Sequence, residues 1–122
     1  MDQQRLQLGL LAGLADPKLM KAINAMHAEP SRAWSLEDLA AVAGMSRARF
    51  AARFRATVGV TPGAYLSEWR LGVAQSLLRR GKPLQVIASE VGYGSASALS
   101  RAFSAHLGLS PTDWLRRDST GR

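Results

Sequence analysis

Apolar side chains recur at intervals of three and four residues along the chain, and no stretch sustains an alternation of apolar and polar residues. Intervals of three and four place apolar side chains on one face of an α-helix, whereas strands need a period of two. Glycine and proline interrupt the pattern at regular places, as they do where helices end and begin. The pattern therefore predicts an all-α chain.

Four predicted helices fill the first two thirds of the chain, and each is preceded by a Ser, Thr or Asp residue that can cap a helix N-terminus. We expect them in residues 16–27, 35–44, 46–59 and 61–81, with Asp16, Ser35, Ser46 and Thr61 as the caps. The last of these helices is the longest. Its inward stripe is predicted to be Tyr65, Leu66, Trp69, Val73 and Leu77.

After Pro83 the pattern of the second and third helices starts again. Residues 48 positions apart (92 − 44 = 48) match first, and they are Leu36, Ala40 and Gly44 with Leu84, Ala88 and Gly92. Residues 49 positions apart (95 − 46 = 49) match next, and they include Ser46, Phe54, Gly59 and Pro62 with Ser95, Phe103, Gly108 and Pro111. The offset grows by one, so the second copy has one extra residue in its turn.

Each copy has the layout of a helix-turn-helix unit. A small alanine in the first helix allows close crossing, a glycine makes the turn, a serine caps the second helix, and an apolar residue anchors it. The sequence therefore predicts two helix-turn-helix subdomains joined by a long helix. We expect a linker or extra helix in residues 1–15, the subdomains in 16–60 and 82–117, the joining helix in 61–81 and a tail in 118–122.

The second helix of each copy is predicted to show small and basic side chains to solvent. With Phe50 and Phe54 turned inward, the opposite face centres on Ala48 and Ala52; in the other copy, Leu99 and Phe103 turned inward leave Ser97 and Arg101 outside. Neither helix contains a carboxylate, so both can approach a phosphate-lined groove without repulsion. The candidate DNA contacts are Arg47, Ala48, Arg49, Ala51, Ala52, Arg53, Arg55, Ala96, Ser97, Ser100, Arg101 and Ser104, with Ser46 and Ser95 as caps that can meet phosphate.

The arginines are expected to divide the work. Arg101 is placed to meet the O6 and N7 atoms of a guanine, while most of the arginines at positions 47, 49, 53 and 55 should bind phosphate. Alanines cannot donate hydrogen bonds, so Ala48 and Ala52 could only touch a thymine methyl or permit close approach. The second copy should therefore read sequence by hydrogen bonds more than the first.

Charge supports an anionic partner and the composition argues against an enzyme. Sixteen Lys and Arg residues against nine Asp and Glu residues give a net charge of +7. There is no cysteine, and the two histidines are not spaced as ligands of a metal. The sequence GYGS follows a helical pattern rather than a strand, so it does not fit a nucleotide-binding loop. We expect no catalytic site, no metal and no cofactor, and a helical protein-interaction module is the alternative.

The N-terminal residues lack the basic start of a signal peptide, and no apolar run approaches membrane-spanning length. We therefore expect a cytoplasmic protein without a membrane partner. The apolar residues that open the chain suggest a fragment of a longer protein, which as this fragment should be a monomer. The long helix, if it spans residues 62–80, is roughly 28 Å in length at ~1.5 Å per residue. That length is comparable to the ~34 Å between successive major grooves, so one chain could reach two adjacent grooves.

Residues 87–116, IASEVGYGSASALSRAFSAHLGLSPTDWLR, resemble the signature of the second unit in the DNA-binding domains of AraC/XylS-type bacterial transcription regulators. The resemblance extends over roughly residues 16–116. It implies about seven helices in two helix-turn-helix subdomains, and binding of double-stranded promoter DNA, commonly to activate transcription. Members also contact RNA polymerase and usually carry a separate sensing or dimerising domain.

The resemblance also implies where bases are read. The base-facing sites of the first unit fall on Ala48, Ala51 and Ala52, where many members have larger polar or aromatic residues. Those of the second unit fall on residues 96, 97, 100 and 101.

Overall fold

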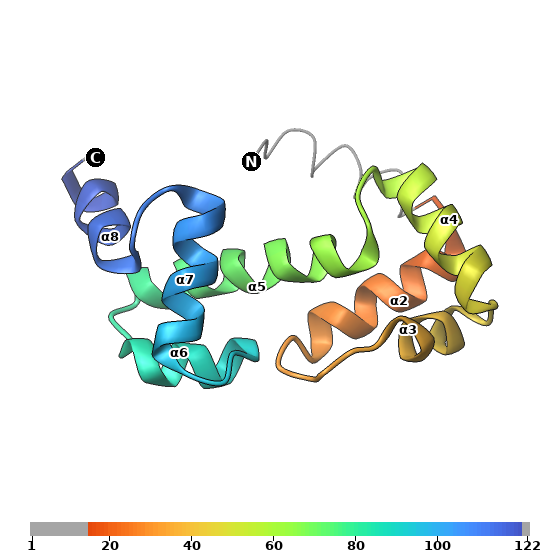
Figure 1. Ribbon diagram of the computed structural model, residues 1–122, viewed down its shortest axis with the longest axis horizontal. Helices are drawn as coiled ribbons and strands as arrows, with labels where there is room; N and C mark the ends of the chain where they lie inside the picture. The colour runs from red at the N-terminus through yellow and green to blue at the C-terminus, as the bar shows by residue number, and fades with distance from the viewer. Residues whose placement is uncertain (1–14, 121–122) are drawn as a thin grey trace. The chain divides into compact units, whose positions relative to one another are not determined.

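The computed structural model describes residues 15–120, and this part of the chain contains helices and no strand (Figure 1). The predicted all-α fold with two helix-turn-helix units and a long joining helix is confirmed. The helices are α2 (Pro17–Ala28), α3 (Leu36–Ala43), α4 (Arg47–Val58), α5 (Pro62–Arg79), α6 (Leu84–Val91), α7 (Ala96–Leu107) and α8 (Pro111–Thr120). None of the helices in the described range is long and apolar enough to cross a membrane.

Side chains at the predicted caps start these helices. The Asp16 carboxylate accepts hydrogen bonds from the backbone N–H groups of Lys18 and Leu19, which otherwise lack partners in the first turn of α2. Ser35 and Asp38 form a capping box at the start of α3, in which each side chain accepts from the other residue's backbone N–H. The predicted caps Ser46 and Ser95 are confirmed in the same way for α4 and α7.

Glycines with positive φ end the first helix of each unit. Gly44 has φ 69° after α3 and Gly92 has φ 92° after α6, a conformation that residues with a Cβ rarely adopt. One residue, Met45, separates the first glycine from its serine cap, whereas Tyr93 and Gly94 separate the second pair. The predicted extra residue in the second turn is thus present, and the two turns otherwise use the same chemistry.

The chain divides into two compact units, one of Asp2–Ser67 and one that includes Glu68–Arg122. In the first unit α2, α3 and α4 surround an aromatic centre, where the ring centroids of Phe54 and Tyr65 lie 5.8 Å apart. His27 on α2 joins it, because its Nε2 lies 2.6 Å from the Tyr65 hydroxyl. The larger buried side chains of this core are Leu19, Ile23, Met26, Leu39, Phe50, Phe54, Val58, Tyr65 and Leu66.

The second unit is built around Phe103 of α7. Its ring packs edge-on against the ring of Trp114 of α8, and the two ring centroids lie 5.8 Å apart. Arg79, the last residue of α5, lies over the Trp114 ring and donates two hydrogen bonds to Asp118, at 3.1 and 3.2 Å. These contacts hold α8 against the end of α5. The remaining core comes from Leu71, Ala74, Leu77, Leu78, Ile87, Ala88, Val91 and Leu99.

The prediction of one continuous inward stripe along α5 is incomplete. Val73 is half-buried and packs against the second core, and Trp69 is half-buried, while Leu71, Ala74 and Leu78, which the predicted stripe left out, are buried. The reason is that α5 contributes to both cores. Tyr65 and Leu66 in its first turns are buried in the core of the first unit, whereas its later turns are buried in the core of the second unit. The buried face therefore changes along the helix, which a single periodic stripe cannot describe.

Two helix ends also differ from the expected boundaries. α5 ends at Arg79, ahead of Gly81, and α8 continues to Thr120, past residue 117 where the second subdomain was expected to end. Asp118 is thus part of a helix rather than of a tail, and it bonds to Arg79. The expected linker or extra helix in residues 1–15 falls almost wholly outside the described residues. The subdomain boundaries themselves stay a prediction.

Candidate nucleic-acid interface

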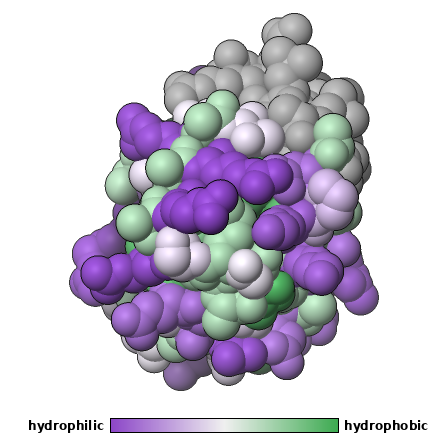
Figure 2. Space-filling model, turned by 90° about the vertical axis from the view of Figure 1, so that its right-hand side faces the viewer, coloured by the Kyte–Doolittle hydropathy of each residue, from purple (hydrophilic) through white to green (hydrophobic). Residues whose placement is uncertain are grey.

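Helix α4 presents small and basic residues to solvent. Its apolar stripe of Phe50, Phe54 and Val58 is buried, which turns the other side of the helix outward. The candidate residues Arg47, Ala48, Arg49, Ala52, Arg53 and Arg55 are exposed, and Ala51 is half-buried. No Asp or Glu lies in this helix. The space-filling view of this side of the molecule shows pale green, moderately apolar surface between purple hydrophilic side chains (Figure 2).

Helix α7 is oriented in its own unit in the same way. Leu99 and Phe103 are fully buried, so Ser97, Arg101 and Ser104 are exposed, and the candidates Ala96 and Ser100 are half-buried. This helix also contains no Asp or Glu. The structure therefore places the predicted residues of each copy on the outer side of one helix.

The arginines of α4 have different surroundings. The Nε atom of Arg53 donates a hydrogen bond of 2.6 Å to Oδ2 of Asp16, the cap of α2. Arg47 lies 3.9 Å from Glu37, but both side chains are largely exposed, so this pair is weak. Within residues 15–120 no ion pair involves Arg49, Arg55 or Arg101.

The Asp16 carboxylate accepts hydrogen bonds from two different helices. Its side chain is only 11% exposed, and its two oxygens serve the backbone of α2 and the guanidinium of Arg53. Burial by itself would raise the pKa of this carboxyl, but the hydrogen bonds from Leu19, Arg53 and Lys18 and the charge of Arg53 together lower the pKa. The carboxylate thus stays ionised, and the start of α2 is tied to the middle of α4.

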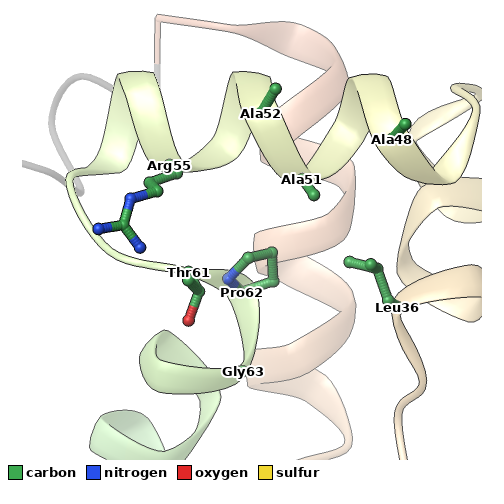
Figure 3. A pocket seen from close by; sticks show the side chains of 8 residues that line it. All are labelled: Leu36, Ala48, Ala51, Ala52, Arg55, Thr61, Pro62 and Gly63. Atoms are coloured by element: carbon green, nitrogen blue, oxygen red, sulfur yellow. The ribbon is translucent and has the colours of Figure 1, made fainter.

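An apolar groove of about 560 Å³ runs along one side of α4, between that helix and the first residues of α5 (Figure 3). Figure 3 shows Ala51 and Arg55 pointing from α4 toward the turn that carries Thr61 and Pro62, with Leu36 of α3 closing one end. The residues that line it are Leu36, Ala48, Ala51, Ala52, Arg55, Thr61, Pro62 and Gly63. We call it the α4–α5 groove.

Sequence reasoning found the α4 side of the groove but missed Leu36, Thr61, Pro62 and Gly63 as members of a surface. It also missed the bond between Arg53 and Asp16, which are 37 positions apart. No periodic signal links such distant residues. In the described part of the chain, no three His, Asp or Glu side chains gather in a way that could hold a metal ion.

Known proteins are similar to this chain in sequence and in fold. Residues 39–117 match the family model described as a helix-turn-helix domain. A putative AraC-like transcription regulator of Streptomyces lividans is 50% identical over 107 residues, covering 87% of this chain and 35% of that protein. The RCS-specific transcriptional activator RclR of Escherichia coli K12 is 40% identical over 116 residues, covering 94% of this chain and 41% of the relative. The chain thus spans well under half of the length of these curated relatives.

Among solved structures, the DNA-binding domain of the global transcriptional factor AdpA, determined in complex with a target DNA, superposes with a TM-score of 0.79 and 30% identity. The likeness covers 88% of this chain and 96% of the AdpA domain. Because the family model matches most of the chain and the fold agrees along nearly the whole AdpA domain, this chain belongs to the DNA-binding domains of AraC-type bacterial transcription regulators.

Proposed function

We propose that the chain binds specific double-stranded DNA by placing α4 and α7 in major grooves, and that it thereby regulates transcription. The observation that carries this proposal is that both helices follow a helix-turn-helix turn and expose a face with arginine and without carboxylate. Such a face suits a phosphate-lined groove. The AdpA domain, solved with its target DNA, supports the same use of the fold. Family members are transcription regulators, so the chain is not an enzyme.

Each helix contributes in its own way. Arg101 is exposed near the centre of the outer face of α7, where its planar fork can pair with O6 and N7 of a guanine. Ser97, Ser100 and Ser104 flank it and can exchange hydrogen bonds with base edges or phosphates, beside the small Ala96. On α4, the arginines at positions 47, 49 and 55 bind phosphates and set the register, and the alanines at 48, 51 and 52 meet the bases. Ser46 and Ser95 open these helices, whose N-termini favour phosphate.

Arg53 receives a different role from the one expected. Its guanidinium is bound to Asp16 at 2.6 Å, and it is 42% exposed, so it is only partly available to DNA. We infer that Arg53 orients α4 relative to α2 and acts on DNA binding as a positioning residue.

The two helices are proposed to enter adjacent major grooves. Helix α5 has 18 residues, or roughly 27 Å at ~1.5 Å per residue, a length similar to the ~34 Å of one DNA turn. A single chain can then contact two half-sites, where most helix-turn-helix proteins use a dimer.

A second part of the proposal concerns a longer regulator that would contain this chain. Since the chain covers only part of its curated relatives, a sensing or dimerising domain is proposed to accompany it in a longer regulator. Activation through contact with RNA polymerase is proposed because one relative is named a transcriptional activator. Such a regulator works in the cytoplasm, where bacterial promoters are.

The test is titration of duplex DNA at several salt concentrations, with a site chosen by selection from a random pool. The slope of log K against log [salt] should be about −0.9 for each phosphate that a basic residue neutralises. A flat slope, or no binding at low salt, would favour the protein-interaction module instead.

Arg101→Ala provides the specific arm of the same experiment. It should cost about 1–3 kcal/mol on the selected site and relax preference at one base pair, with little effect on random DNA. Arg55→Ala, the control, should weaken binding to selected and random DNA alike. Equal losses on both DNAs for Arg101→Ala would contradict its assignment to a base.

A further inference from the structure

The α4–α5 groove is apolar along almost its whole length. Among its lining residues only Arg55 carries a charge and only Thr61 has a hydroxyl group. The α4 side consists of Ala48, Ala51, Ala52 and Arg55, which recur at intervals of three and four residues and therefore share one stripe of the helix. The groove thus offers methyl groups where a recognition helix usually offers hydrogen bonds.

The second copy of the unit has polar residues at the equivalent positions. An offset of 49 residues carries Ala48, Ala51, Ala52 and Arg55 to Ser97, Ser100, Arg101 and Ser104. Every one of these four side chains can form hydrogen bonds. The corresponding positions of the two copies are therefore apolar in α4 and polar in α7.

The chemistry of the major groove limits what an apolar stripe can recognise there. Hydrogen-bond donors and acceptors on the base edges can be read only by a side chain that forms hydrogen bonds, and the alanine side chain forms none. The apolar feature of the major groove is the C5-methyl group of thymine. An alanine that covers this methyl removes it from water and gains free energy that cytosine cannot supply.

The charges around the groove favour DNA as its occupant. Arg55 lines the groove, Arg47 and Arg49 are exposed on the same helix, and α4 contains no carboxylate. These arginines can bind phosphates on the DNA backbone while the alanines lie against the bases. An uncharged apolar partner would gain nothing from these arginines.

We propose that the unit Asp2–Ser67 recognises thymine through its methyl group, which lies in the α4–α5 groove against Ala48, Ala51 and Ala52. The inference rests on the proposed placement of α4 in a major groove. The chain then reads one half-site by apolar contact and the other by hydrogen bonds from α7.

The experiment replaces thymines of the selected site one at a time by deoxyuridine, which lacks only the methyl group. In the half-site that α4 contacts, at least one replacement should weaken binding about fourfold, the effect of losing one buried methyl-sized group. In the other half-site each replacement should leave the affinity unchanged. The α4 half-site is located with an Ala56→Cys variant that carries a DNA-cleaving iron chelate, because the chain has no cysteine of its own and Ala56 is exposed.

Matched variants connect the effect to the groove. Ala48→Ser and Ala52→Ser add a hydroxyl group to the stripe and should bring the ratio of thymine to deoxyuridine affinity toward one. Ala56→Ser, on α4 but outside the groove, should leave the ratio as in the wild type.

Three results would overturn the proposal. They are an α4 half-site without any effect of deoxyuridine, equal effects in both half-sites, and a ratio that Ala48→Ser and Ala52→Ser do not change. In each of these cases salt-dependent binding to the selected site would persist, so the proposed function would survive. Loss of salt-dependent binding altogether would overturn both.

Discussion

Arg53 on α4 and Arg101 on α7 both occupy exposed positions, but their surroundings differ. Arg53 is bound to a largely buried carboxylate of α2, whereas Arg101 forms no ion pair with any residue of the described range. A bound guanidinium has fewer donors left for phosphate and fixes the helix that carries it. At the scale of single residues, exposure alone therefore does not identify a DNA contact.

Asp16→Asn tests the positioning role of Arg53. Asparagine caps a helix about as well as aspartate, so this change removes the charge of the pair and keeps the start of α2. We expect Asp16→Asn and Arg53→Ala to weaken binding to the selected site by a similar factor, at most about fivefold for a pair worth ~1 kcal/mol. The double variant should be no weaker than either single one. The salt slope should stay unchanged in all three.

Arg49→Ala is the matched control, because Arg49 is exposed on the same helix and has no ion pair within residues 15–120. It should reduce the salt slope by about 0.9, as the loss of one phosphate contact requires. If Arg53→Ala reduced the slope in the same way while Asp16→Asn left affinity intact, Arg53 would be a phosphate contact. Wild-type affinity in both variants would show that the pair only stabilises the fold.

At the scale of elements, α4 and α7 are made by the same local sequence pattern and differ in how they are held. α4 is fixed by Asp16 and by the aromatic contacts of Phe54 with Tyr65. α7 is fixed by Phe103 against Trp114, on a helix that Arg79 and Asp118 attach to the end of α5. Asp16 and Arg53 are 37 positions apart, and Arg79 and Asp118 are 39 positions apart, so each helix is held in part through a contact between residues that are remote in the sequence.

The link between α2 and α5 predicts a pH dependence of stability. Burial lowers the pKa of His27, whose Nε2 lies 2.6 Å from the hydroxyl of Tyr65. Because the pKa of His27 is lower in the folded state than the unfolded value of ~6.5, the folded state favours the neutral ring. The contribution of His27 to the free energy of unfolding is therefore complete above pH 6.5 and declines as the pH falls below it. The free energy of unfolding should therefore decrease between pH 7 and pH 5, above the range in which Asp16 and Asp38 titrate. Chemical denaturation at a series of pH values measures it.

His27→Gln should flatten this decrease, since glutamine does not titrate. His106→Gln is the control, because His106 is exposed on α7. Within residues 15–120, the ring of His106 forms a hydrogen bond only with the carbonyl oxygen of Ala102. An unchanged pH dependence in His27→Gln would show that another group causes it.

At the scale of the whole molecule, two units with similar turns and different surfaces share one long helix. The net charge of +7 favours an anionic partner such as DNA, and the outer faces of α4 and α7 differ in chemistry, since the first carries alanines where the second carries serines and an arginine. If both units bind DNA as proposed, their linkage through α5 increases the affinity, because binding of one unit raises the effective concentration of the other.

The linkage predicts that one chain protects two half-sites about 10–10.5 base pairs apart. Insertion of five base pairs between them puts the half-sites on opposite faces of the duplex and should reduce affinity by at least about 100-fold. Insertion of ten should also reduce it, because one helix of roughly 27 Å does not span two turns. Footprinting and mobility shifts measure both. Full affinity after the ten-base-pair insertion, or protection of a single half-site, would contradict the proposal.

Much of this architecture follows from sequence because helix starts, helix ends and exposed faces depend on neighbouring residues. Ser46 and Ser95 cap, Gly44 and Gly92 end helices, and spacing alone turns Phe50 and Phe103 inward. These are interactions over four residues or fewer, which periodicity and cap chemistry describe. The stripe of α5 could not be predicted in the same way, because its direction changes where the helix passes from one core to the other.

By itself, the sequence determined the all-α class, the duplicated helix-turn-helix unit and the residues that α4 and α7 show to solvent. Only the tertiary structure decided that Arg53 is bound to Asp16 and that Leu36, Thr61 and Pro62 complete a groove beside the alanines of α4. The physical reason is distance along the chain. Local patterns choose the helix and its faces, whereas contacts between remote residues exist only after the helices have packed, and packing depends on the shape of every side chain in the core.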